Sequence, residues 1–191
     1  GTLINSLIWT NDGKVGSGAL SFDGVDDGVS LTSNPTNFSL PFTISAWVKT
    51  NTVTGSHQIL SSNTNQFYQV SGTSLAYKTN NISTTFSGAF TNKIGVWQHV
   101  AVKYDGTNIT IYINGVSGTP NPITAIDGGT AKIGRYSTIA TEFWNGSIDD
   151  VRVYNRALLA SEVTELFNQG QSTVITPPVS NTLPPINPPT S

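Results

Sequence analysis

The chain has 191 residues, a net charge of −2 and only 10% charged side chains, and serine, threonine and asparagine together make up about a third of it. Its nine basic residues form no patch that would neutralise a phosphate backbone, so nucleic acid is not an expected partner. Cysteine is absent and no stretch approaches the roughly 20 apolar residues that cross a bilayer, so we expect neither thiolate chemistry nor membrane insertion.

Short β-branched and aromatic runs alternate with Gly, Asn and Asp turns along the chain, which is typical of a β-sandwich or barrel. The expected strands lie at residues 19–22, 28–31, 42–49, 58–61, 67–70, 97–104, 108–113, 131–134 and 146–154. Within residues 42–49, apolar side chains recur at every second position and share one face. The dipeptide Asp105-Gly106 indicates a hairpin between two strands. These signals predict an all-β fold.

One short helix is expected over residues 161–168. Ser161 is a capping residue and Glu162 is an acid in the first turn. The expected buried face consists of Val163, Leu166 and Phe167. We expect the helix to stop at Gly170 and to pack against one edge of the sandwich.

The composition changes at Ser172, and residues 172–191 hold six of the ten prolines. Such a segment favours polyproline II over a helix or a strand ladder. It is interpreted either as a stiff linker to another module or as an arm that docks on a neighbouring subunit. The chain is therefore divided into a sandwich domain, residues 1–171, and a Pro-rich linker or docking tail, residues 172–191.

Four segments resemble those of a known family, in order and at plausible spacing over nearly all of residues 1–170. They are Gly18–Val29, Phe42–Lys49, Gly95–Gly106 and Gly146–Leu158. Together they are similar to the laminin-G-like, concanavalin A-like lectin/glucanase superfamily. The resemblance implies a two-sheet antiparallel jelly roll, used in secreted enzymes, adhesins and surface proteins as a carbohydrate-binding or spacer domain. It also implies a calcium ion near the edge of the sandwich.

The sequence departs from this family at its beginning. Relatives usually carry another strand, with an aromatic residue and an Asp-Ser-x-Gly-Asn turn, before a segment like Gly1-Thr2-Leu3. That strand is absent here. Either it has been removed or another chain supplies it, because an unpaired sheet edge invites the addition of a strand.

An acidic side chain interrupts an apolar face of the last expected strand. Period-two alternation groups Asp149 with Val151 and Val153, where a carboxylate is costly unless it is paired, hydrogen-bonded or bound to a metal. The turn after residues 19–22 adds Asp23 and Asp27, and the resemblance points to the same two segments. Because carboxylate oxygens suit calcium, we expect Asp23, Asp27 and Asp149 to contribute to a structural calcium site. The alternative is that these acids bond turn amides and hold no ion.

A ligand surface is predicted around Trp144, which lies beside a turn where an aromatic ring can face solvent. Tyr136, Arg135 and Asn145 would line the same surface. The alternative is that Trp144 covers a sheet edge. The tryptophan of residues 42–49, Trp47, is expected to be packed rather than to stack on a sugar.

No catalytic residues are expected. Glycoside hydrolases of the retaining class need two carboxylates about 5 Å apart. The three glutamates are Glu142, Glu162 and Glu165, and the last two fall on the expected helix. No strand carries a Glu-x-Asp-x-x-Glu-like pattern.

The sequence therefore predicts a non-catalytic module of a larger secreted protein, located outside the cell or at its surface. Its expected partner is a glycan or a cell-surface polymer. The alternative is a structural subunit of a cell-surface fibre or adhesin. Such a subunit would assemble with copies of itself or with neighbouring modules, through strand donation or through the Pro-rich tail.

Overall fold

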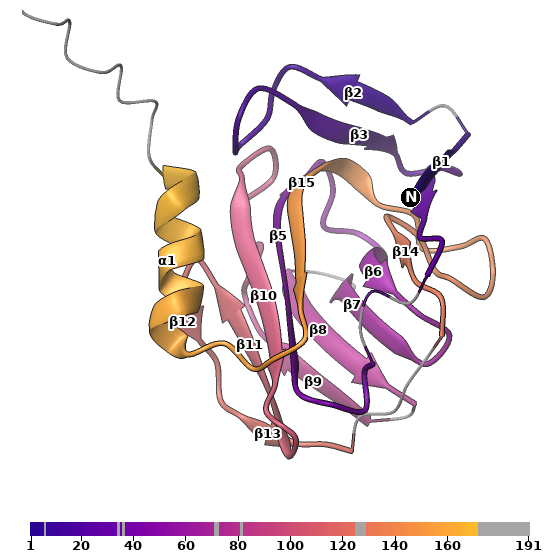
Figure 1. Ribbon diagram of the computed structural model, residues 1–191. Helices are drawn as coiled ribbons and strands as arrows, with labels where there is room; N and C mark the ends of the chain where they lie inside the picture. The colour runs from indigo at the N-terminus through magenta and orange to yellow at the C-terminus, as the bar shows by residue number, and fades with distance from the viewer. Residues whose placement is uncertain are drawn as a thin grey trace, which may run out of the picture.

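The computed structural model describes residues 1–5, 7–33, 35, 37–70, 73–80, 82–124 and 129–171. They form two antiparallel sheets and one helix (Figure 1). The seven-stranded sheet has the order β1–β4–β14–β6–β7–β8–β9. Its strands are β1 (Thr2–Ile4), β4 (Gly28–Ser30), β14 (Lys132–Ile133), β6 (His57–Ser61), β7 (Asn65–Val70), β8 (Ser74–Thr79) and β9 (Ile82–Phe86).

The eight-stranded sheet has the order β12–β11–β10–β5–β15–β3–β2, and β13 also pairs with β11. Its strands are β12 (Val116–Ser117), β11 (Asn108–Ile113), β10 (Gln98–Tyr104), β5 (Phe42–Thr50), β15 (Asn145–Tyr154), β3 (Ala19–Asp23), β2 (Ile8–Thr10) and β13 (Asn121–Pro122). The predicted all-β sandwich is confirmed. The predicted linker or docking tail, residues 172–191, lies outside the described residues.

The hairpin predicted at Asp105-Gly106 joins β10 to β11, with Tyr104 opposite Ile109. The Asp105 side chain accepts the amides of Thr107 and Asn108, at 2.9 and 2.7 Å, so the turn is closed by its own sequence. The β8–β9 hairpin was not predicted. Its strands lack a strong local pattern, and β8 is held between β7 and β9 by ladders on both sides.

The hydrophobic core lies between the two sheets. The alternation predicted for residues 42–49 is confirmed, since Phe42, Ile44, Ala46 and Val48 are all fully buried in it. The opposite sheet contributes Ile59, Leu60, Phe67, Leu75 and Tyr77. This two-sided burial of large apolar side chains is the main source of stability for such a sandwich.

The helix α1 (Ala160–Gln171) lies on the outer face of the eight-stranded sheet, not at its edge as predicted (Figure 1). Its Phe167 ring stacks on Trp47 with centroids 5.8 Å apart, and His99 lies 5.3 Å from Trp47. Trp47 is therefore buried, at 1% exposure. Burial lowers the pKa of His99 to about 4, so this histidine is neutral beneath the helix at pH 7.

Gly170 does not end the helix as predicted but lies inside its last turn. A Cβ at this position would lie 2.4 Å from the ring of Trp47. The glycine is thus required by close approach of helix and sheet, and the helix continues to Gln171 because tertiary packing outweighs the low helix propensity of glycine.

A β-bulge interrupts β15. Asp149 pairs with Trp47 and Arg152 with Ser45, so β15 carries one residue more than β5 between these pairs. Asp150 lies within the bulge and has a positive φ of 46°. Strict alternation would group Asp149 with the valines. The bulge instead turns Val151 and Val153 toward the core and leaves Asp149 on the outer face, which corrects the prediction made for this strand.

The close contact between Gly170 and Trp47 should reverse the usual effect on stability of replacing a helical glycine by alanine. Gly170→Ala normally stabilises a helix by about 1 kcal/mol. Here it should destabilise the protein by roughly 1–3 kcal/mol, because the methyl group would overlap the Trp47 ring. Urea denaturation measures the change. Gln171→Ala, at an exposed position of the same turn, serves as the control and should have little effect. A stabilised Gly170→Ala variant would contradict the packing described.

Candidate functional site

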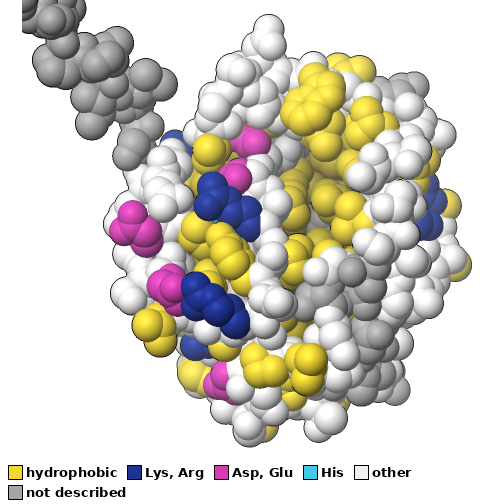
Figure 2. All heavy atoms as spheres, viewed as in Figure 1, with side chains coloured by type: hydrophobic (Ala, Val, Ile, Leu, Met, Phe, Trp, Pro, Cys, Tyr) yellow, Lys and Arg dark blue, Asp and Glu magenta, His cyan; other side chains and the backbone are white. Residues whose placement is uncertain are grey.

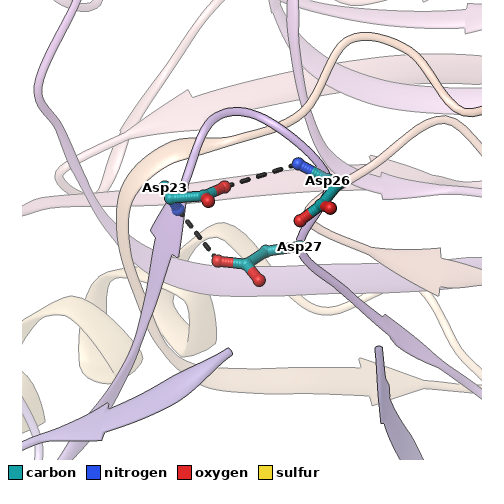
Figure 3. A group of neighbouring side chains, drawn as sticks. All are labelled: Asp23, Asp26 and Asp27. Carbon is teal, nitrogen blue, oxygen red and sulfur yellow. Dashed lines mark hydrogen bonds between the residues drawn. The ribbon is translucent and has the colours of Figure 1, made fainter. Parts of the chain in front are cut away.

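The turn between β3 and β4 brings three carboxylates together, those of Asp23, Asp26 and Asp27 (Figure 3). One carboxylate oxygen from each lies within 4.8 Å of the others. Asp23 Oδ1 accepts the amides of Val25, at 2.8 Å, and Asp26, at 3.4 Å, so the tight turn is held by the side chain that opens it. Two of these acids, Asp23 and Asp27, are predicted metal ligands, and Asp26 is a third that the prediction did not include.

Asp27 is the buried member of this acidic turn, at 2% exposure. Its Oδ2 accepts the Asp23 amide at 3.0 Å, whereas its Oδ1 is buried and has no hydrogen-bond partner among the described residues. Burial, reinforced by the charges of Asp23 and Asp26, raises the pKa of Asp27. The turn therefore gathers more negative charge than its own amides neutralise.

Asp149 does not join the acidic turn. Asn145, not Asp149, is the β15 residue opposite Asp23, and Asp149 lies four positions further along, roughly 13 Å away. Its Oδ2 accepts the amides of Lys14 and Val15, at 2.7 and 2.8 Å, and its Oδ1 accepts its neighbour's amide at 2.7 Å. This is the alternative considered above, a carboxylate that is satisfied by loop amides.

Trp144 is fully buried, at 0% exposure, and belongs to the hydrophobic core. This corrects the prediction of a ring that faces solvent. Trp144 immediately precedes β15, and its amide donates to the carbonyl oxygen of Gly134 at 2.7 Å. The chain crosses from one sheet to the other at this point, and the ring therefore points inward. Asn145 is half-buried and holds the loop after β5. Its backbone carbonyl accepts the amide of Asn51 at 2.9 Å, and its side-chain oxygen accepts the Asn51 side-chain amide at 3.2 Å.

Arg135 lies between the acidic turn and Phe143. Its guanidinium group is 3.4 Å from the carbonyl oxygen of Asp26 and 5.0 Å from the centre of the Phe143 ring. Gly28 permits this position, since a Cβ there would lie 2.4 Å from Cδ of Arg135. The predicted ligand residues are thus separated: Arg135 joins the acidic turn, Trp144 the core, and Asn145 a structural loop.

Tyr136, the fourth predicted ligand residue, reaches a surface that the prediction did not describe. We call the outer side of the seven-stranded sheet around Gln58, Gln66, Tyr68, Lys78, Tyr136 and Glu142 the polar face. Gln66 and Tyr68 alternate with the core residue Phe67 and so point outward. Tyr136 lines a shallow polar pocket of about 340 Å³ with Gln66 and Lys78, and also with Asn63, Thr64 and Asn80.

A hydrogen-bond network holds the polar face in place. The Gln58 amide group donates to Glu142 at 2.5 Å and to Gln66 at 3.2 Å. Burial, followed by the charge of Glu142, raises the pKa of Tyr68, whose hydroxyl is hydrogen-bonded to Ser83. Glu142 has a positive φ of 54°, and such strained conformations cluster at ligand-binding sites. Gln58 is fully buried and fixes the positions of Gln66 and Glu142, and Gln66 lines the pocket.

Part of the polar face was visible in the sequence. Residues 67–70 were predicted as a strand, and alternation about Phe67 would have placed Gln66 and Tyr68 together on its outer side. Glu142 carried no such signal. It lies outside the strands, and its backbone conformation and its bond to Gln58 arise only when the loop before β15 folds against β6.

The two antiparallel sheets define a β-sandwich, and comparison with known proteins places the chain in a family of this class. Residues 23–164 match the family described as the concanavalin A-like lectin/glucanases superfamily. The chain belongs to this family. A search of curated proteins found no match.

Several solved structures share the fold. Domain 4 of AbnA, an extracellular arabinanase from Geobacillus stearothermophilus in complex with arabinotriose, has a TM-score of 0.70 and 20% identity, covering 86% of each chain. The binding domain of Paraclostridial Mosquitocidal Protein 1 has a TM-score of 0.69 and 17% identity, covering 87% of this chain and 47% of that one. The botulinum neurotoxin serotype D binding domain has a TM-score of 0.68 and 14% identity, covering 87% of this chain and 46% of that one. The chain thus spans about half of each toxin domain. None of the described helices is long and apolar enough to cross a membrane.

The burial of Trp144 changes what its removal should do. Trp144→Ala should destabilise the protein by roughly 3–5 kcal/mol, because it opens a large cavity in the core. Tyr136→Ala, at a half-exposed position, should cost less than about 1 kcal/mol. Guanidinium denaturation of both variants tests the assignment. Equal stability of Trp144→Ala and wild type would mean that the ring is at the surface after all.

Proposed function

We propose that the chain is a non-catalytic carbohydrate-binding module whose polar face holds the sugar. The observation that carries this proposal is the network of Gln58, Gln66 and Glu142, whose member Gln66 lines the pocket together with Tyr136. Sugars offer hydroxyl groups that need paired donors and acceptors, and apolar C–H faces that pack on aromatic rings. Amide, carboxylate and phenol groups at fixed positions meet both needs, and their order before binding reduces the entropy lost on binding.

The comparisons support a binding role but do not indicate a particular ligand. The neighbours with this fold are binding domains, and one was solved with arabinotriose. At 20% identity or less, this likeness concerns the fold, so the sugar itself is a matter for experiment. Neutral or weakly charged glycans suit the polar face, because it combines one lysine with one carboxylate. An extracellular or cell-surface location is part of the same proposal.

Titration calorimetry of the 191-residue chain with arabinotriose, followed by a glycan array, tests the proposal. Tyr136→Ala should weaken binding about tenfold, equivalent to about 1.4 kcal/mol, because it removes an aromatic wall of the pocket. Glu142→Gln should weaken binding without unfolding the protein. Tyr154→Ala, a half-exposed tyrosine on the other sheet, is the matched control and should bind as wild type does. An equal loss in Tyr154→Ala, or no binding to any glycan, would refute the polar face as the site.

We further propose a structural calcium ion at the acidic turn, held by Asp23, Asp26 and Asp27. The buried, unpartnered Oδ1 of Asp27 fits a hard cation, and so does the all-oxygen donor set. When bound, the ion would neutralise the mutual repulsion of the three carboxylates. Asp149 is replaced by Asp26 in this proposal because the Asp149 oxygens are occupied by amides.

The raised pKa of Asp27 gives the calcium proposal a pH signature. A carboxyl group whose pKa is raised on folding stabilises the folded state when protonated, and that stability is lost as the pH rises through its folded pKa. In EDTA at pH 7, Asp27→Asn should therefore melt above wild type, and the difference should vanish below the ordinary pKa of 3.8. Excess calcium should raise the melting temperature of wild type by roughly 5–10 °C when its concentration is about 100 times Kd.

Two variants test whether calcium binds at the acidic turn or at Asp149. Asp27→Asn should lose the calcium response, whereas Asp149→Asn should keep it despite being less stable. Differential scanning calorimetry with calcium and with EDTA measures both. A calcium shift that survives in Asp27→Asn, or a wild-type melting temperature that EDTA leaves unchanged, would eliminate the site.

A further inference from the structure

One edge of the strand β15 is open. β15 pairs with β5 from Gly146 to Tyr154, but with β3 only from Asn145 to Ile148. Within the described ranges, no strand pairs with β15 beyond Ile148 on the β3 side. Backbone N–H and C=O groups of Val151–Tyr154 that point away from β5 therefore lack a ladder partner, a geometry that accepts an added strand.

An apolar groove lies beside this edge. It has a volume of about 190 Å³ and is lined mainly by Trp9, Leu20, Val29, Ile133, Ile148 and Val151. Figure 2 shows a hollow lined with hydrophobic side chains on this face of the molecule, below the position of β2 and β3 in Figure 1. At its rim Trp9 is 70% exposed. The exposed Trp9 ring extends this apolar lining to the surface of the molecule.

The edge and the groove together specify the chemistry of an occupant. The bulge directs Val151 and Val153 into the sandwich, so a strand beside them would place every second side chain in the same layer. Only an extended peptide supplies both backbone groups for the edge and apolar side chains for the groove. The charged groups nearby are already neutralised, since Asp149 is bonded to amides and Arg152 is paired with Asp150 at 2.9 Å. The occupant is therefore an uncharged, extended segment with apolar side chains.

The described chain ends over the outer face of the same sheet, near β5 and β15. Gln169 Oε1 is 3.5 Å from the Arg152 guanidinium group, and Gly170 lies against Trp47, whose backbone pairs with Asp149. The segment that follows, Ser172–Thr176, is uncharged, rich in β-branched residues and free of proline, so each of its residues has an N–H group. Pro177 and Pro178 then prevent any longer ladder.

We propose that residues 173–176, which lie outside the described residues, add to the edge Val151–Tyr154 of the same molecule. One of Val174 and Ile175 then fills the groove. In extended form four residues reach roughly 13 Å, which matches the four edge residues. Attachment to α1 provides a high effective concentration, so a short strand suffices. This proposal is independent of the sugar-binding role.

Hydrogen exchange with mass spectrometry on the full 191-residue chain tests the docking. The double variant Val174→Asp, Ile175→Asp should raise exchange in residues 151–154 about tenfold, because charged side chains cannot enter the groove. Ile186→Asp, a change of the same kind further along the tail, is the matched control and should leave exchange unchanged. Exchange in β10 reports global unfolding and should be the same in all variants.

Each other outcome overturns the proposal. Equal exchange of the edge in wild type and the double variant would mean that nothing from residues 173–176 covers it. An equal rise in exchange in Ile186→Asp would show that residues 173–176 have no specific role in protecting the edge. Protection that disappears on dilution would place the occupant in a second copy of the chain, as the assembly alternative predicts.

A covalent trap gives an independent readout that does not depend on stability. The chain has no cysteine, so introduced pairs can be interpreted without interference. Val153→Cys is combined in turn with Val174→Cys, its opposite residue in an antiparallel ladder, and with Ile175→Cys, its opposite residue in a parallel one, and one of these pairs should form a disulfide within a monomer. Val153→Cys with Ile186→Cys should not. Failure of both tested pairs, or crosslinking only between molecules, would refute docking within one chain.

Discussion

The carboxylate of Asp149 ties the N-terminal loop to a central strand of the eight-stranded sheet. By accepting the amides of Lys14 and Val15, it fixes the loop before β3 against the start of the bulge in β15. The bulge in turn decides which residues of β15 enter the core and which reach the end of α1. The packing of the core, the position of the helix and the open edge of β15 all depend on this one local arrangement.

The two proposed sites share a segment of the chain. Arg135 and Tyr136 are consecutive, and the first lies against the acidic turn while the second lines the pocket of the polar face. The polar face depends also on the loop before β15, because Glu142 is held by Gln58. The groove beside β15, by contrast, has an apolar lining and a strand edge that no described strand covers, and these features suit a peptide rather than a sugar. The chemistry of each surface thus supports a different proposed occupant.

Much of the fold could be predicted because its signals are local. Alternation in residues 42–49 and the Asp105-Gly106 turn each act within a few residues, and both predictions are confirmed. The candidate sites were predicted less well. The period-two interpretation of β15 was wrong because one extra residue at Asp150 reverses the faces that follow, and this insertion has no clear mark in the sequence. Trp144 was misplaced for a related reason, since a residue beside a turn faces inward or outward according to where the chain must cross the sandwich.

The sequence by itself determined the class of fold, the positions of the main strands along the chain and the presence of a C-terminal helix, because these follow from side-chain periodicity and turn chemistry. It also determined that acids would gather in the turn at residues 23–27. Only the tertiary structure decided that Asp26 rather than Asp149 completes that cluster, that Gly170 continues a helix, and that Gln58, Glu142 and Tyr136 come together. These outcomes depend on the register between strands far apart in the chain, which no local pattern encodes.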